Sequence, residues 1–241
     1  MREADPVAAR YLGTAYLEAN PTWDAEDSPW KAARVRELLE ANAVRPRSIV
    51  DVGCGAGRVL AELQRGYPAA RLAGYDIAPD AERFWPQLRA RGIELTVGDF
   101  TAASAEAWDV LLALDVLEHL PDPFAFLGRI RGRASRYVFH FPLDLSAINV
   151  LREAPLLHAR RKVGHIHYYT RNLALALLEE SGFRVLEARY TGAGFTAPRR
   201  TLKTWFASFP RRLVRLAGMH WGVRLLGGET LMVLAADRDA A

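Results

Sequence analysis

The stretch at residues 48–60, SIVDVGCGAGRVL, constrains the fold of this chain more than any other feature. An apolar run ends at Asp51 and leads into three alternating glycines, Gly53, Gly55 and Gly57, after which helical spacing begins. Glycines let the chain turn sharply after a buried strand and let a ligand approach bare N–H groups, because no Cβ stands in the way. The stretch therefore predicts a strand, a cofactor-binding loop and a helix, in that order.

The spacing of this loop, D-x-G-x-G-x-G, distinguishes between two classes of cofactor. The dinucleotide-binding fingerprint G-x-G-x-x-G has its third glycine one place later and requires no acid before the first. The carboxylate of Asp51 would repel a pyrophosphate, whereas it can accept hydrogen bonds around a ligand that carries an ammonium group. The spacing therefore disfavours a nicotinamide oxidoreductase and favours a ligand such as S-adenosylmethionine. A strand-to-helix turn without a ligand is the alternative.

Residues 51–57 resemble the first motif of the class I S-adenosylmethionine-dependent methyltransferases, and the resemblance extends over roughly residues 47–190. It implies a Rossmann-like, doubly wound α/β fold with a seven-stranded, mostly parallel sheet whose last strand is antiparallel. It also implies that S-adenosylmethionine is the cofactor. The loop residues that the resemblance assigns to the cofactor site are Asp51, Gly53, Cys54, Gly55 and Gly57.

Periodicity by itself indicates only an alternation of strands and helices. Short apolar runs alternate with helical segments, which is typical of a mostly parallel sheet flanked by helices. Ser28 and Pro29 are interpreted as the N-cap and first residue of a helix that runs to Ala43. Thr170 is expected to cap a helix that Gly182 closes. Strands are expected at residues 48–52, 71–76, 93–97, 108–114, 136–141, 183–190 and 229–235, and a further helix at 123–131.

Polar residues also follow the second and third expected strands. Asp76 closes the second strand about 25 residues after Asp51, a position from which an acid can accept hydrogen bonds from both hydroxyls of a ribose. Its neighbour Ile77 would then cover one face of the adenine. By resemblance, Asp99 reads the adenine amino group, with Phe100 as a stacking surface. An acid at the end of a strand is more often simply solvated. The assignment to a cofactor site therefore depends on Asp76 and Asp99 occurring together at the ends of two strands.

The stretch LDVLEHLPDP, residues 114–123, resembles the motif after the fourth strand in small-molecule methyltransferases, including the ubiquinone-biosynthesis O-methyltransferases. In a helical turn, Asp115, Glu118 and His119 would share one face. With His165 or His167 as a fourth ligand, they could hold a divalent cation such as magnesium. RNA 3′-end ribose methyltransferases use a comparable arrangement, in which the first acid is Glu. The alternative is that Asp115 contacts the cofactor, Glu118 caps a turn and His119 lines a metal-free substrate pocket.

Methyl transfer from a sulfonium is an in-line displacement, so the protein must hold the acceptor against the methyl group and remove a proton. Histidines after the fourth and fifth expected strands suit that role because they titrate near neutral pH. We expect O-methylation of a small hydroxylated biosynthetic acceptor, with lipid- or sugar-linked acceptors included. The candidate bases are His119, His165 and His167.

Two other functions stay open. Methylation of RNA ends agrees with the arginine content, but the core region lacks a basic stripe with interleaved aromatic residues, so a nucleic-acid partner is disfavoured. A regulatory module without catalysis would bind the cofactor and turn over no acceptor.

We expect one domain with a flanking segment. Residues 1–46 form an N-terminal helical segment whose NPTWDAEDSPWKA stretch would cover the cofactor site or cap a helix. Residues 47–241 form the cofactor-binding domain, with substrate-side insertions at 142–169, which fits neither period, and at 191–229. The second insertion mixes arginines with aromatic residues, so it can lie on an anionic membrane or contact a lipid-linked acceptor. Alternatively, it covers a sheet face while its arginines stay in water.

Composition sets loose bounds on these expectations. The chain has 241 residues, half of them hydrophobic, which suits one substantial core. No apolar stretch has the length of a membrane span, and the charged N-terminus does not resemble a signal peptide, so a cytoplasmic protein is expected. Its single cysteine, Cys54, excludes an intramolecular disulfide and suits a small packing residue in the loop.

Overall fold

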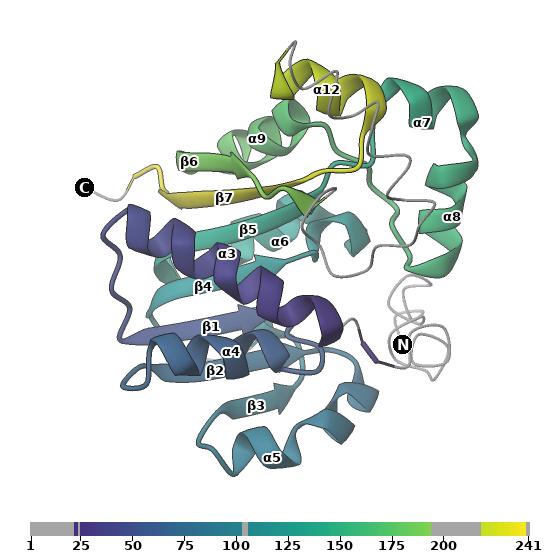
Figure 1. Cartoon of the computed structure of the whole chain (residues 1–241). Helices are drawn as coiled ribbons and strands as arrows, with labels where there is room; N and C mark the ends of the chain where they lie inside the picture. The colour runs from purple at the N-terminus through teal and green to yellow at the C-terminus, as the bar shows by residue number, and fades with distance from the viewer. Residues whose placement is uncertain (1–21, 24, 103–105, 194–217, 240–241) are drawn as a thin grey trace.

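The computed structural model describes residues 22–23, 25–102, 106–193 and 218–239. Within them, a seven-stranded sheet has the order β3-β2-β1-β4-β5-β7-β6 (Figure 1). All neighbouring strands are parallel except where β7 pairs with β5 and β6. The predicted fold class, with its antiparallel last strand, is confirmed. The strands are β1 (Ser48–Val52), β2 (Arg71–Asp76), β3 (Glu94–Val97), β4 (Trp108–Leu114), β5 (Ala134–Pro142), β6 (Phe183–Tyr190) and β7 (Thr230–Asp237).

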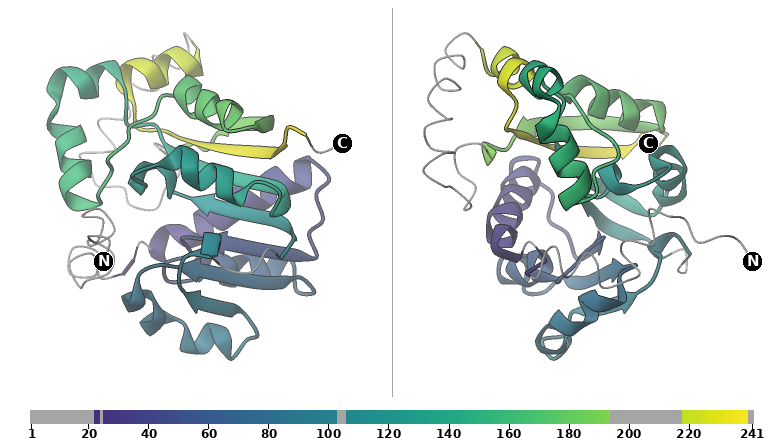
Figure 2. Two further views of the ribbon diagram at one scale, coloured as in Figure 1. Left: turned by 180° about the vertical axis from the view of Figure 1, so that it is seen from behind. Right: turned by 90° about the vertical axis from the view of Figure 1, so that its right-hand side faces the viewer.

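Helices cover both faces of this sheet. In Figure 1, α3 and α4 lie in front of the central strands, and the view from behind shows α6 and α9 on the opposite face (Figure 2, left). Three further short helices, α7, α8 and α12, lie beyond the sheet at one edge. The helices are α3 (Ser28–Ala41), α4 (Arg58–Gly66), α5 (Pro86–Arg89), α6 (Pro123–Ile130), α7 (Ala147–Arg152), α8 (Ala154–Lys162), α9 (Arg171–Glu180) and α12 (Met219–Leu226), with 3-10 turns η1 (Ala25–Asp27), η2 (Pro79–Phe84), η3 (Phe100–Ala102) and η4 (Leu117–His119).

Two hydrophobic clusters, one on each face, hold the sheet between its helices. The first joins Leu111 of β4 to Leu127 of α6 and Leu177 of α9. The second joins Leu112 of β4 to Leu38 of α3. Neighbouring residues of β4 face opposite layers, because side chains alternate along a strand. The central strands are therefore apolar on both faces, which explains the continuous apolar runs in the sequence.

The bounds of two predicted helices can be compared with the structure. Thr170 caps α9 as predicted, accepting a hydrogen bond from Leu173 N at 3.3 Å. The N-cap of α3 is Asp27 rather than Ser28, because η1 already turns the chain before Ser28. This helix ends at Ala41, before the positive-φ residue Ala43 (φ 55°).

Two expectations concern insertions and the N-terminal segment. The segment 142–169 contains α7 and α8, and these helices bury no side chain completely, so they carry no apolar period facing a core. Much of 191–229 and of 1–46, namely 194–217, 1–21 and 24, lies outside the described residues.

Among the described residues, no helix is both long enough and apolar enough to cross a membrane.

Candidate active site

The glycine loop after β1 lies between two cavities. The apolar cavity, of about 380 Å³, contains Tyr75, Asp76 and Ile77 in its wall. The polar cavity, of about 370 Å³, is lined by acids, histidines and the loop itself. The two cavities share the wall residues Trp23, Gly53, Asp115 and His119.

The loop needs glycine for two physical reasons. Gly53 and Gly55 have φ of +77° and +50°, which disfavours residues with a side chain. A Cβ on Gly53 would lie 2.7 Å from Val116 Cγ2, and one on Gly55 would lie 2.6 Å from Trp23 Cδ1. The loop is anchored to β2 because Gly53 N donates a hydrogen bond to Tyr75 O at 2.8 Å. The sequence pattern and the backbone geometry therefore agree.

Asp51, the penultimate residue of β1, is a buried acid without a complete set of partners. Its side chain lines the polar cavity, the residue is only 2% exposed, and its Oδ1 atom accepts no hydrogen bond. Burial raises the pKa of Asp51 to about 8, Asp76 adds to this, and Lys31 opposes it. A buried carboxylate oxygen that lacks a donor fits a ligand with an ammonium group.

Asp76, at the end of β2, joins two segments. Its carboxylate accepts hydrogen bonds from Gly55 N at 2.7 Å and from Ala78 N at 2.9 Å. Burial raises the pKa of Asp76 although these two bonds oppose the shift. Each carboxylate oxygen has a further lone pair, so Asp76 can also accept from a ligand hydroxyl in the apolar cavity.

Three other expected cofactor contacts also line the apolar cavity. Ile77 is 40% exposed and offers an apolar face. Asp99 accepts hydrogen bonds from the backbone and hydroxyl of Thr101. Phe100 is only 2% exposed, with the Arg133 guanidinium 4.3 Å from its ring centroid. Phe100 therefore has little ring face left to stack on a ligand, contrary to the sequence-based expectation.

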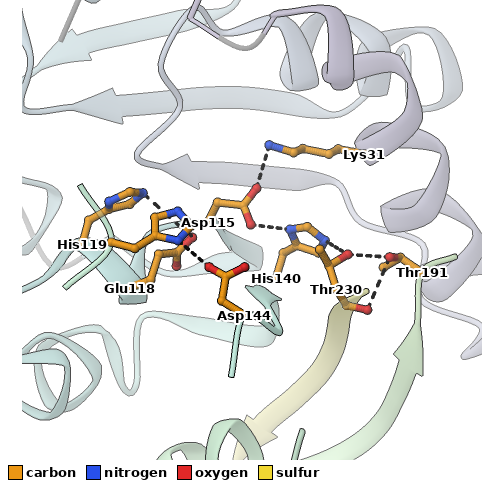
Figure 3. A network of polar contacts seen from close by, with 9 residues as sticks. Lys31, Asp115, Glu118, His119, His140, Asp144, Thr191 and Thr230 are labelled. Carbon is orange, nitrogen blue, oxygen red and sulfur yellow. Dashed lines mark hydrogen bonds and ion pairs between the residues drawn. The ribbon is translucent and has the colours of Figure 1, made fainter. Parts of the chain in front are cut away.

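Asp115 anchors a chain of polar contacts (Figure 3). Its carboxylate lies between Lys31 Nζ, 2.7 Å from Oδ2, and His140 Nδ1, 2.6 Å from Oδ1. His140 Nε2 lies 2.7 Å from Thr230 Oγ1, which contacts the hydroxyl of Thr191. Burial alone would raise the pKa of Asp115, but His140 and Lys31 hold it well below its usual range. Asp115 is therefore ionised near neutral pH.

Glu118, His119 and His165 form a second cluster beside this chain. Glu118 Oε1 lies 3.9 Å from His119 Nε2 and 4.0 Å from His165 Nε2. Glu118 is completely buried, and neither of its carboxylate oxygens accepts a hydrogen bond. Burial raises the pKa of Glu118 well above its usual value, and the negative charges of Asp115 and Asp144 add to this.

Backbone hydrogen bonds bring the members of this cluster together. Ile166 N and His167 N both donate to Glu118 O, at 2.8 and 3.1 Å, so the segment before α9 pairs with η4. His165 Nδ1 donates to Asp144 Oδ2 at 2.7 Å, which orients the ring. His167 Nε2 lies 2.9 Å from Leu120 O. His167 is not among the described residues that line the two cavities, so its geometry suits a positioning role.

The structure corrects the expected ligand set for a metal. The turn that carries Glu118 and His119 is a 3-10 turn, and Asp115 precedes it with φ of +55°. The Asp115 carboxylate consequently contacts Lys31 and His140 instead of joining the cluster. Among the described residues, the potential ligand atoms of Glu118, His119 and His165 lie within 4.8 Å of one another. Three of the four expected ligands are therefore grouped.

Several wall residues were not assigned to the site from the sequence. Lys31 and Trp30 come from α3, and Trp30 lies edge-on to His140 with ring centroids 6.2 Å apart. Trp23, before η1, lies against Gly55. The NPTWDAEDSPWKA stretch, which contains Trp23, Trp30 and Lys31, was the available signal for these wall residues, whereas Asp144, the partner of His165, has no distinguishing pattern around it.

A family model described as a methyltransferase domain matches residues 25–188, more than half of the chain. The chain belongs to this methyltransferase family. Two curated relatives agree. The match to the ubiquinone biosynthesis O-methyltransferase of Parvibaculum lavamentivorans is 36% identical over 118 residues, 42% of this chain and 44% of the relative. The match to the trans-aconitate 2-methyltransferase of Mycobacterium sp. (strain KMS) is 30% identical over 96 residues, which are 39% of this chain and 37% of the relative. The chain spans less than half the length of either relative.

Solved structures of methyltransferases share the fold. An N-methyltransferase from Bradyrhizobium japonicum, in complex with S-adenosylhomocysteine, matches with a TM-score of 0.58 and 16% identity over 98% of this chain and 100% of that chain. The magnesium protoporphyrin IX methyltransferase of Synechocystis, with bound S-adenosylmethionine, matches with a TM-score of 0.60 and 14% identity. This match also covers 98% of this chain and 100% of that chain. Together with the family match, these structures show that the chain has the fold of solved methyltransferases that carry S-adenosylmethionine or S-adenosylhomocysteine.

Proposed function

We propose that this methyltransferase transfers the methyl group of S-adenosylmethionine to an oxygen of a small hydroxylated acceptor bound in the polar cavity. The observation that carries the proposal is that one cavity contains both the partly unpaired carboxylate of Asp51 and the cluster of Glu118, His119 and His165. The name of the first curated relative, an O-methyltransferase, supports an oxygen acceptor.

The residues around the glycine loop fit the cofactor. Oδ1 of Asp51 can accept a hydrogen bond from the cofactor's ammonium group, which would complete the partners of this buried oxygen. On the other side of Gly53, Asp76 can accept from a ribose hydroxyl and Ile77 can cover the adenine. When bound, S-adenosylmethionine supplies a methyl group that is activated by its positively charged sulfur.

The second task of the protein is to remove a proton from the acceptor. The acceptor oxygen forms a bond to the methyl carbon while the carbon–sulfur bond breaks, and the hydroxyl proton must leave. His165 suits this role because its Nδ1–H is bonded to Asp144, which leaves Nε2 to accept a proton. Asp144 would orient the ring and stabilise the resulting imidazolium. We therefore assign His165 as the base and Asp144 as its positioning residue.

Calorimetric titration with S-adenosylhomocysteine, run beside NADH, tests the cofactor assignment. We expect affinity in the micromolar range for the sulfur nucleotide, its loss in Asp76→Ala, and no heat from NADH. Absence of binding to S-adenosylhomocysteine would contradict the proposed function. Binding without methyl incorporation into any of a panel of catechols, hydroxy acids and RNA ends would identify a non-catalytic module instead.

The proposed base is tested with Asp144→Asn. We expect this variant to lower kcat about tenfold to a hundredfold and to change the pH profile, while the affinity for S-adenosylhomocysteine stays unchanged. His165→Gln should lower kcat at least as much. Unchanged kcat in both variants would exclude His165 as the base and leave His119 as the candidate.

A divalent cation is a second arrangement that one observation favours. Both oxygens of Glu118 lack hydrogen bonds although they are buried beside two imidazoles. A cation there would favour ionised Glu118 against the effect of burial, and the Asp144 contact of His165 is typical of metal-bound histidine. One carboxylate and two imidazoles suit a transition ion such as zinc or manganese better than magnesium, which prefers oxygen ligands.

The two roles of His165 exclude one another, because a metal ligand and a base would both use Nε2. Turnover with and without excess EDTA, together with metal analysis of the purified protein, separates them. Full activity after chelation would exclude a required cation and would support His165 as the base. Loss of activity that zinc or manganese restores would favour the cation, and then Glu118→Gln should abolish the retained metal.

A further inference from the structure

The edge of the molecule formed by α7, α8 and α12 differs from the rest of the fold. In Figure 2 (right), these three short helices lie together on the side that faces the viewer. α7 and α8, of six and nine residues, contain no completely buried side chain. Isolated helices of this length are marginal in water, because most helical stability comes from packing of an apolar face. Their faces are therefore available to a partner.

Apolar side chains are concentrated on this surface. Among the described residues, eleven large hydrophobic side chains are exposed, and six of them belong to the three helices. Leu151 is 86% exposed and Trp221 is 58% exposed, although solvent disfavours both side chains. α7 contacts both α8 and α12, and apolar groups exposed on neighbouring helices mark a candidate interaction site. The six residues are Ile148, Val150, Leu151, Leu157, Trp221 and Leu225.

The segments that contain the three helices also carry a positive charge. Residues 147–163 and 218–228 contain five lysines and arginines against one acid, Glu153. Within the described part of the chain, Arg152, Arg161 and Lys162 are exposed and form no ion pair. Their charges are thus available for a negatively charged partner. The basic residues are Arg152, Arg160, Arg161, Lys162 and Arg224.

We propose that this surface, made by the three helices, docks the protein onto an anionic lipid membrane. Apolar side chains can enter the boundary between headgroups and acyl chains, while lysines and arginines contact anionic headgroups. Charge complementarity selects this occupant, because a second copy of the chain would bring the same positive surface against itself. The surface is also continuous with the polar cavity, since Val163, directly after α8, lines that cavity. A membrane-bound amphiphilic acceptor would therefore reach the site without crossing the whole surface.

Sedimentation with vesicles of phosphatidylcholine and phosphatidylglycerol tests the proposal. We expect the wild-type protein to bind these vesicles and to bind pure phosphatidylcholine vesicles at least tenfold more weakly. Arg161→Glu with Lys162→Glu should reduce binding to the anionic vesicles at least tenfold, and Leu151→Glu severalfold. Binding should also fall as salt is raised, because surface charges are screened.

Matched controls separate the surface from general charge and folding. Arg91→Glu with Arg184→Glu changes the net charge equally at exposed sites elsewhere and should leave binding unchanged. Phe124→Glu is the control for Leu151→Glu, because it replaces an exposed apolar residue outside the three helices, and it should also leave binding unchanged. Titration with S-adenosylhomocysteine on every variant shows that the fold is retained, and this readout is independent of lipid binding. The proposal is overturned if the wild-type protein ignores anionic vesicles, if the controls weaken binding equally, or if Leu151→Glu instead converts a dimer into a monomer in light scattering.

Discussion

At the scale of single residues, burial and charge decide what each acid can do. Asp51 and Glu118 lie in surroundings that favour their protonated forms, because burial removes the water that would stabilise a charge. Asp115 is only partly buried, and Lys31 and His140 keep it ionised. Within one site, Asp115 is therefore ionised at neutral pH, whereas the surroundings of Asp51 and Glu118 favour the protonated form.

The pKa of Asp51 predicts how cofactor affinity depends on pH. In the ligand-free protein the pKa is about 8, so Asp51 is largely protonated at pH 6, whereas the ammonium group of the ligand favours the ionised form. The affinity for S-adenosylhomocysteine should rise up to about tenfold per pH unit between pH 6 and 8 and then level off. Calorimetry in buffers of different ionisation enthalpy should detect proton release on binding.

Asp51→Asn is the matching variant. It should bind S-adenosylhomocysteine weakly and with little pH dependence between 6 and 8. Although the variant binds the ligand more weakly, its ligand-free form should be more stable than the wild-type protein at high pH. The raised pKa of Asp51 lowers wild-type stability as pH rises from about 4 to 8, so the ligand-free variant should melt higher than wild type at pH 8 and equally at pH 4. A steep pH dependence that persists in the variant would contradict this assignment.

Lys31 stabilises the fold through Asp115. The depressed pKa of Asp115 contributes stability that is present above its unfolded pKa and is lost as pH falls through the lower folded value. Lys31→Met should therefore cost about 3 kcal/mol at pH 7, and the loss should shrink below pH 4. Urea unfolding at both pH values measures it. Arg34→Met, which removes an exposed pair with Glu37, should cost under about 1 kcal/mol.

At the scale of elements, turns decide where side chains converge. The 3-10 turn η4 aims Glu118 and His119 at the segment before α9, and two backbone hydrogen bonds to Glu118 O hold that segment against it. The positive φ of Asp115 turns its carboxylate toward α3. A regular α-helix at these positions would have placed all three acidic and imidazole groups on one face.

The glycine loop offers a test at this scale. Gly55→Ala adds a Cβ in a left-handed conformation and against Trp23, so the loop or the tryptophan must move. We expect the affinity for S-adenosylhomocysteine to fall at least tenfold, as measured by calorimetry. Gly128→Ala in α6 is the control, because its Cβ would meet no atom within 4 Å. The control should keep affinity and gain about 0.5–1 kcal/mol of stability. Equal affinity in both variants would contradict a role for the loop in binding.

At the scale of the whole molecule, the antiparallel strand completes the site. Because β7 runs against its neighbours, its first residue, Thr230, lies opposite Pro142 at the carboxyl end of β5. Thr230 can therefore contact His140, whose other ring nitrogen contacts Asp115. The strand that closes the sheet thus extends the polar chain that begins at α3.

Stability should be concentrated in the two clusters on the faces of the sheet. Leu111 is completely buried in β4, so Leu111→Ala should cost about 2–5 kcal/mol in urea unfolding. Leu151→Ala removes the same atoms from an exposed position of α7 and should change the unfolding free energy by less than about 0.5 kcal/mol. A large loss from Leu151→Ala would mean that the α7 surface packs against another part of the chain.

Local patterns in the sequence determined the strands, the glycine loop and the positions of Asp51 and Asp76, because apolar runs and glycine spacing report on neighbouring residues. Tertiary structure alone decided the partners: Lys31 with Asp115, Asp144 with His165, and Gly55 with Asp76. These residues are far apart in the chain, and their contacts depend on strand order, on turn geometry and on the removal of water. The same distinction applies to α7 and α8. Their sequence lacks a clear period because no part of either helix faces a core, a property that is visible only once the other elements are in place.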